Sequence, residues 1–382
     1  MKNSNSNSYV EESSYLWKGN PKLFKKDIDY TNPYTVVDLF CGAGGASYGF
    51  ASAGFNVVLG IDHLVPALET FRENHKNSST ILGDIEKVDD KMVYEAIDNT
   101  STKVLIGGVP CQGFSLNNRK RREDDPRNQL FYEFVRFIKI LKPEMIMLEN
   151  VSGMRSMKNG EVVENIKAEI ISAGKEIGKN YNVDYKMLNA ADYGVPQLRN
   201  RLIFLGASSD YDISFPEPKF SEENYRTVRD AIGDLPSLKP KEINKKYASE
   251  PSSDFQKLMR KDNEILYNNQ APNHPKKTVD KIKNTVPGEP MYSRYKQRIR
   301  LSWDNPSPTQ VCGGIRPQFQ FGHPEDNRGL TIRERARIQS FPDSFKFKGG
   351  IVQERVQTGN AVPPLLAQAI AEELYMELSR KI

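Results

Sequence analysis

The feature that most constrains the fold is a regular alternation of two kinds of segment between residues 34 and 206. Stretches such as TVVDLF, FNVVLGID and KVLIGGVP are short and rich in β-branched residues, whereas LVPALETFRENH and LFYEFVRFIKILK have helical spacing. Strands that alternate with helices favour a parallel sheet with helices on its faces. The predicted fold class is therefore α/β, with a doubly wound, mostly parallel, Rossmann-like sheet.

The alternation divides the chain into segments of different character. Residues 1–33 are rich in Asn, Ser and Lys and predict a polar N-terminal extension. Residues 34–206 form the predicted α/β domain. Residues 207–327 are rich in Pro, Asn, Lys and Asp without the alternation, which predicts a second, smaller and irregular domain. Residues 328–354 connect the two, and the apolar helix within 355–382 is expected to complete the first domain.

Composition narrows the class of protein only modestly. The 382 residues carry a net charge of +5, which permits a polyanionic partner without requiring one. Cys41, Cys111 and Cys312 lie far apart and the four histidines are scattered, so neither a disulfide framework nor a metal site is predicted. The first twenty residues lack the apolar stretch of a signal peptide, and no run is long enough to span a bilayer. These absences favour a cytoplasmic protein.

A glycine-rich turn and two acids predict a nucleoside site. Gly42, Gly44 and Gly45 follow the first strand in DLFCGAGG, where they would let a ligand approach the backbone. Asp62 and Asp84 end the next two predicted strands, and an acid there can bind ribose hydroxyls or an adenine amino group. Gly turns and strand-end acids occur in any α/β protein, but three such signals in register favour the nucleoside.

Two further strand ends carry reactive side chains. Cys111 lies in GGVPCQGFS, a loop directly after a strand, where ligands of open sheets bind. A lone cysteine is more often an inert buried residue, although a Pro-Cys-Gln-Gly loop is not an apolar run. Glu149 ends the apolar strand EMIMLENV, and a partly desolvated acid there can donate a proton. A strand-end salt bridge is the alternative for Glu149.

The segment QLRNR provides three alternating polar residues. Gln197, Arg199 and Arg201 would point to one face if the segment is a strand. Two guanidinium groups on one face suit a phosphate or a carbonyl oxygen. A solvated strand face is the alternative.

Taken in order, these segments resemble the cytosine-C5 DNA methyltransferase family over residues 34–206 and 301–382. The matching motifs are DLFCGAGG (38–45), Asp62, GDI (83–85), PCQGFS (110–115), ENV (149–151), QLRNR (197–201), RGLTIRERARIQSFPD (328–343) and GNAVPP (359–364). Three positions depart from the family pattern. Many relatives have Glu at the position of Asp62, an aromatic residue at that of His63 and a small residue at that of Arg335.

The resemblance implies S-adenosyl-L-methionine as the cofactor. The residues that would border it are Phe40, Gly42, Gly44, Gly45, Asp62, Asp84, Ile85, Pro110, Asn360 and Ala361. The resemblance also gives the reacting groups their roles. Cys111 would attack carbon 6 of cytosine, Glu149 would donate a proton at N3 and Arg201 would stabilise O2. Arg199 would hold the loop carrying Cys111 or a phosphate.

Double-stranded DNA is the implied partner, with the target cytosine flipped out of the helix. The residues expected to contact DNA are Gln112, Ser115, Arg119, Arg121 and Arg122 in one basic loop and Arg294 and Arg298 in MYSRYKQRIR. Either segment could instead be an ordinary solvated surface. We expect a monomer that belongs to a bacterial restriction-modification system or to an orphan methylation system. A cognate restriction endonuclease, in the first case, would form no stable complex with it.

Three other functions compete with this one. A tRNA cytosine-C5 methylase would use the same catalytic domain, but the small domain lacks the Cys-Phe-Thr signature of such enzymes. A catalytically inactive DNA-binding relative would not need Cys111, Glu149 and both arginines. A nucleotide-dependent oxidoreductase is disfavoured because G-x-G-x-x-G is absent.

Overall fold

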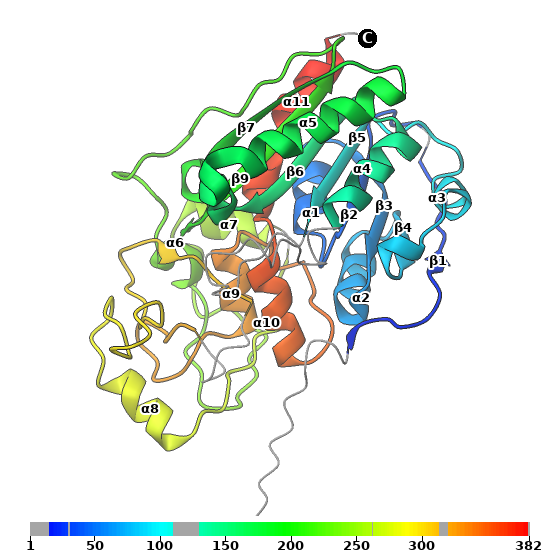
Figure 1. Ribbon diagram of the computed structural model, residues 1–382. Helices are drawn as coiled ribbons and strands as arrows, with labels where there is room; N and C mark the ends of the chain where they lie inside the picture. Colours follow the sequence, from blue (N-terminus) through cyan, green and yellow to red (C-terminus); the bar gives the residue numbers. More distant parts are fainter. Residues whose placement is uncertain (1–14, 30, 110–129, 262, 313–319, 381–382) are drawn as a thin grey trace, which may run out of the picture.

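The computed structural model describes residues 15–29, 31–109, 130–261, 263–312 and 320–380. A large α/β domain and a smaller, mostly irregular domain lie side by side, with α9 and α10 between them (Figure 1). Helix α9 spans Ile332–Ile338 and α10 spans Ile351–Asn360.

An eight-stranded sheet forms the centre of the large domain, in the order β1-β4-β3-β2-β5-β6-β9-β7. The strands are β1 (Lys22–Phe24), β2 (Thr35–Leu39), β3 (Asn56–Asp62), β4 (Ser79–Leu82), β5 (Val104–Gly108), β6 (Met145–Val151), β7 (Tyr181–Asn189) and β9 (Asn200–Ser208). Strands β2 to β6 are parallel, whereas β9 is antiparallel to both β6 and β7. The predicted doubly wound, mostly parallel sheet is confirmed.

Helices cover both faces of this sheet. One face packs on α3 (Asp90–Ala96), α4 (Leu130–Leu141) and α5 (Glu161–Glu176), and the other on α1 (Gly45–Ser52), α2 (Val65–Asn74) and α11 (Pro364–Ser379). The neighbours Val36 and Val37 on β2 are both fully buried and belong to opposite clusters, as the alternation of side chains along a strand requires. A strand buried on both faces needs apolar residues at every position, which explains why TVVDL is an almost unbroken apolar run.

The end of the polar extension differs from its prediction. Residues 22–24 form the edge strand β1, which pairs antiparallel with β4, and Leu16 makes a bridge to Leu64. The described part of this segment therefore belongs to the sheet of the large domain. A three-residue strand is too short to produce a readable alternation, so the sequence gives no signal for it.

The small domain has its own core. Its helices are α6 (Val228–Ile232), α7 (Asp254–Arg260) and α8 (Lys276–Lys283). Phe255, Leu301 and Phe321 pack with Ile338 of α9, so this helix contributes to the core of the small domain. A parallel pair of two-residue strands, β8 (Gln197–Leu198) and β10 (Ser307–Pro308), joins the two domains. Among the helices of the described residues, none combines the length and apolarity needed to cross a membrane.

Candidate active site

The glycine turn after β2 is held by an acid from β3. Phe40, Gly42 and Gly44 have positive φ angles of 58°, 54° and 90°. The Asp62 carboxylate accepts the N–H groups of Gly42 and Leu64, both at 2.8 Å, so it fixes the turn and its own loop together. Each carboxylate oxygen can accept a second hydrogen bond, which leaves acceptor capacity for a ligand hydroxyl.

The two positive-φ glycines of the turn meet different surroundings. A Cβ at Gly42 would meet no atom within 4 Å, whereas a Cβ at Gly44 would lie 2.4 Å from the His75 ring. Gly42 thus leaves open space beside the backbone, and Gly44 is needed for packing against a buried side chain.

A buried acid below the turn was not singled out in the sequence. Asp38 on β2 is 2% exposed, and its carboxylate accepts a hydrogen bond from the Ser47 hydroxyl at 2.6 Å. Burial raises the pKa of Asp38 to about 7; the bond from Ser47 opposes this rise and the charge of Asp62 adds to it. The sequence signal that could have identified Asp38 is a single acid within an otherwise apolar predicted strand.

The other described residues that were predicted to border a cofactor lie at neighbouring strand and helix ends. Asp84 follows β4 and accepts the N–H of Glu86 at 3.3 Å, and the adjacent Ile85 is buried. Asn360 ends α10 and is exposed, while Ala361 is half-buried. Pro110, also predicted here, lies outside the described residues.

Glu149 forms an ion pair with Arg201 at the end of β6. The Arg201 Nε lies 2.6 Å from the Glu149 Oε1, and both side chains are 12% exposed. Gly108, the last residue of β5, pairs with Glu149, and a Cβ there would lie 3.4 Å from its Oε2. Burial lowers the pKa of Arg201, and the charge of Glu149 opposes that shift. The carboxylate and the guanidinium therefore share one partly desolvated point at the mouth of the sheet.

Arg199 has a different environment from the one expected. It is 1% exposed, and its terminal nitrogens donate to the carbonyl oxygens of Gln310 at 2.8 Å and of Gly359 and Ala361 at 3.0 Å each. Because both of its terminal nitrogens are already bound to carbonyl oxygens, this guanidinium leaves no terminal nitrogen for a DNA phosphate, and the structure does not support that part of the prediction. It instead ties together segments that lie far apart in the sequence.

Most of the predicted DNA contacts cannot be placed. The predicted nucleophile, Cys111, lies outside the described residues. So do five predicted DNA contacts: Gln112, Ser115, Arg119, Arg121 and Arg122. Arg298 is 1% exposed and lies 4.7 Å and 5.7 Å from the ring centres of Tyr295 and Tyr292. Its guanidinium group lies against the tyrosine rings and not on the surface where the contact was expected, and its Nη1 and Nη2 are buried with no hydrogen-bond partner among the described residues. Arg294 lies 5.8 Å from the Tyr295 ring centre, outside the buried set.

Comparisons with known proteins agree on one family. The family model for C-5 cytosine-specific DNA methylase matches residues 34–376. The Type II methyltransferase M1.HphI of Haemophilus parahaemolyticus is 38% identical over 92% of this chain and 89% of its own length. The Type II methyltransferase M.DdeI of Desulfomicrobium norvegicum is 38% identical over 89% of this chain and 88% of its own.

Solved structures support the same assignment. One described as a DNA modification methyltransferase encoded within a prophage (E. coli) has a TM-score of 0.75 at 27% identity, and the match covers 91% of this chain and 99% of that one. The S. pombe Dnmt2 methyltransferase has a TM-score of 0.55 at 18% identity over 91% of this chain and 99% of its own, and shares the fold. The chain therefore belongs to the C-5 cytosine-specific DNA methylase family and is a DNA cytosine-5-methyltransferase.

Proposed function

We propose that the chain transfers a methyl group from S-adenosyl-L-methionine to carbon 5 of a cytosine flipped out of a specific duplex sequence, with Cys111 as the covalent nucleophile. The observation that carries this proposal is the Glu149–Arg201 ion pair beside Gly108. Cys111 follows Gly108 by three residues, and three residues of chain reach at most about 11 Å. A thiol, an acid and a guanidinium can thus act on one base.

The residues around the glycine turn fit a nucleoside cofactor. Open space lies beside Gly42, and Asp62 has acceptor capacity next to it. Asp84 lies one strand further along the sheet, at the same edge. S-adenosyl-L-methionine bound there would supply an electrophilic methyl group, while Asp62 would bind the ribose and Asp84 with Ile85 the adenine.

The chemistry requires each of the reacting residues. Carbon 5 of cytosine is a poor nucleophile, and addition of the Cys111 thiolate to carbon 6 makes it an enamine carbon. Charge then develops on the ring at N3 and O2. Glu149 donates a proton at N3, and Arg201 stabilises O2. After methylation, a water molecule accepts the carbon-5 proton, the electrons of that C–H bond restore the 5,6 double bond, and the bond to carbon 6 breaks to release the Cys111 thiolate. N3 returns its proton to Glu149.

The setting of the reaction follows from the substrate. A stacked base is out of reach, so the cytosine must be flipped at a cost of roughly a few kcal/mol. We propose a cytoplasmic monomer that acts within a restriction-modification or orphan methylation system. A cognate endonuclease would share its target sequence without forming a stable complex with it.

Duplex DNA containing 5-fluorocytosine tests the mechanism, because fluorine at carbon 5 blocks the elimination and traps the adduct. With S-adenosyl-L-methionine present, we expect a denaturation-resistant complex for the wild-type chain and none for Cys111→Ser. Methylation of tRNA in preference to duplex DNA would support the competing RNA activity. Bisulfite sequencing of DNA from cells expressing the chain would identify the target; an unmethylated genome would contradict the proposal.

A further inference from the structure

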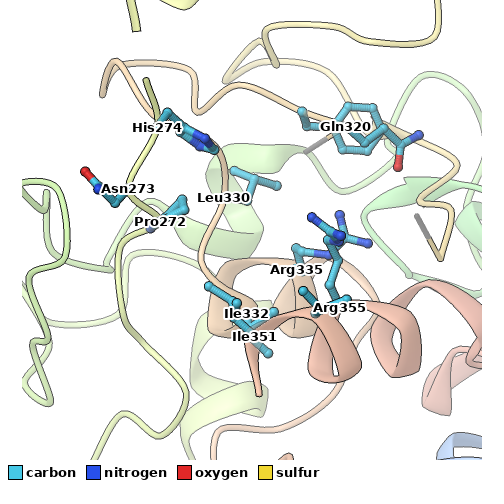
Figure 2. A pocket seen from close by; sticks show the side chains of 11 residues that line it. Pro272, Asn273, His274, Gln320, Leu330, Ile332, Arg335, Ile351 and Arg355 are labelled. Carbon is cyan, nitrogen blue, oxygen red and sulfur yellow. The ribbon is translucent and has the colours of Figure 1, made fainter. Parts of the chain in front are cut away.

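A cavity of about 140 Å³ is lined by residues of the small domain together with α9 and α10. Arg335 of α9 and Arg355 of α10 both project into it, opposite His274 and Gln320 of the small domain (Figure 2). Ile332 and Ile351 also line it, beside the two arginines (Figure 2). The cavity therefore carries two guanidinium groups among apolar side chains.

These two arginines differ from their neighbours in having no acidic partner. Three nearby arginines are neutralised by buried carboxylates: Arg328 by Glu334, and Arg333 and Arg337 by Asp343. Neither Arg335 nor Arg355 forms an ion pair with any residue that the structure describes. Arg335 is buried and Arg355 is half-buried, and a buried charge is normally paired, so the two guanidinium groups are suited to hold an anion between them.

The hydrogen bonds of the pair leave donors for such an anion. Arg335 is 3% exposed and donates through Nε to the Thr358 hydroxyl and through Nη2 to the Val311 carbonyl, both at 3.1 Å. The Arg355 Nε is buried and has no hydrogen-bond partner within the described part of the chain. Burial and the charge of Arg355 lower the pKa of Arg335 to about 9. The thiol of Cys312 lies within electrostatic range of both arginines.

The cavity continues the positive charge of the active site. Arg199 is within electrostatic range of Arg201 on one side and Arg335 on the other, and Arg335 is within range of Arg355. The four arginines form a series. Arg201, at one end, is paired with Glu149, and Arg335 and Arg355, at the other end, line the cavity. A phosphate group of a polyanion and a small free anion could each supply negative charge beside these guanidinium groups, so the experiments below separate the two sources.

We propose that Arg335 and Arg355 clamp one phosphate group of the DNA backbone in this cavity. The proposal rests on the proposed function, since it takes duplex DNA as the ligand. A cavity of this size holds several waters and has room for a phosphate group. Two guanidinium groups supply the charge-assisted donors that phosphate oxygens prefer.

Arg355→Gln and Arg335→Ser test the clamp, and Arg380→Gln is the matched control. Arg380 directly follows α11, the helix that leads to the C-terminus (Figure 1), and it does not line the cavity. Its replacement by Gln removes one positive charge, as each clamp variant does. Duplex affinity is measured at several salt concentrations, with thermal unfolding as a check on folding. We expect each clamp variant to bind about tenfold more weakly and to lower the salt slope by about 1. Arg380→Gln should match the wild type in both measurements.

A second measurement separates the two sources of phosphate. If inorganic phosphate raises the unfolding temperature of the wild type but not of Arg355→Gln, while duplex affinity is unchanged, the cavity takes a free anion and the DNA clamp is wrong. Unchanged salt slopes in both folded variants, without stabilisation by phosphate, would also overturn it. If the wild-type chain binds duplex DNA but methylates no cytosine, the proposed function is contradicted. The clamp can still be tested in that case, because duplex affinity and its salt dependence do not require methylation.

Discussion

The Nε of Arg201 lies 2.6 Å from the Oε1 of Glu149, and neither side chain is more than 12% exposed. The strands that carry these residues are antiparallel neighbours, and Val151 of β6 pairs with Arg201 of β9. The pair is therefore set by the register of the sheet. Its acid faces Gly108, at the point where the chain leaves β5 toward Cys111.

Glu149→Gln should lower kcat about 10²- to 10⁴-fold, the usual contribution of a positioned general acid. The amide keeps the shape of the side chain but cannot donate the same proton to the base. Turnover is measured by methyl transfer to duplex DNA under saturating conditions.

Glu144→Gln is the matched control for this change. Glu144 immediately precedes the same strand, at its opposite end, and its Oε2 lies 2.7 Å from the Lys179 Nζ. The control removes a comparable ion pair and should keep its turnover. An equal loss of kcat in both variants would mean that Glu149 acts through strand stability alone.

Much of the large domain could be predicted because its signals are local. The strands around Val36 and Glu149 are continuous apolar runs, and the long helices have clear periodicity. The two-tyrosine environment of Arg298 and the three carbonyl partners of Arg199 depend on residues brought together only by the tertiary fold. The basic composition of MYSRYKQRIR predicts an exposed segment. The burial of one side chain within it, Arg298, has no local signature in the sequence.

Asp38 should make stability fall as pH rises from about 4 to about 7. Burial raises its pKa in the folded state to about 7, from the ordinary value of 3.8 for this side chain. Between these values the folded state holds a proton that the unfolded state has lost, so the free energy of unfolding decreases with pH. The slope is at most about 1.4 kcal/mol per pH unit.

Comparison with Asp38→Asn isolates this contribution, because the amide does not titrate. Urea unfolding of both proteins at pH 5.5 and 7.5 should show the wild type losing about 2 kcal/mol relative to the variant over that interval. The same difference at both pH values would show that Asp38 is already ionised in the folded state.

Arg199→Met should destabilise the fold by about 3 kcal/mol or more, since three carbonyl groups, two of them fully buried, lose their donor. Chemical denaturation measures the change. Arg380→Met, at an exposed position after α11, should stay within about 0.5 kcal/mol of the wild type. A stable Arg199→Met protein that loses only DNA affinity would restore the phosphate contact that the structure argues against.

Gly42→Ala and Gly44→Ala should separate cofactor binding from packing. Both glycines have positive φ, so each substitution carries a backbone cost of about 1–2 kcal/mol. At Gly44 the added methyl also meets the His75 ring, so that variant should unfold more readily. At Gly42 the methyl enters open space, and the protein should fold while its affinity for S-adenosyl-L-methionine decreases severalfold. Calorimetric titration with the cofactor decides the matter, and unchanged affinity in a folded Gly42→Ala would place the cofactor elsewhere.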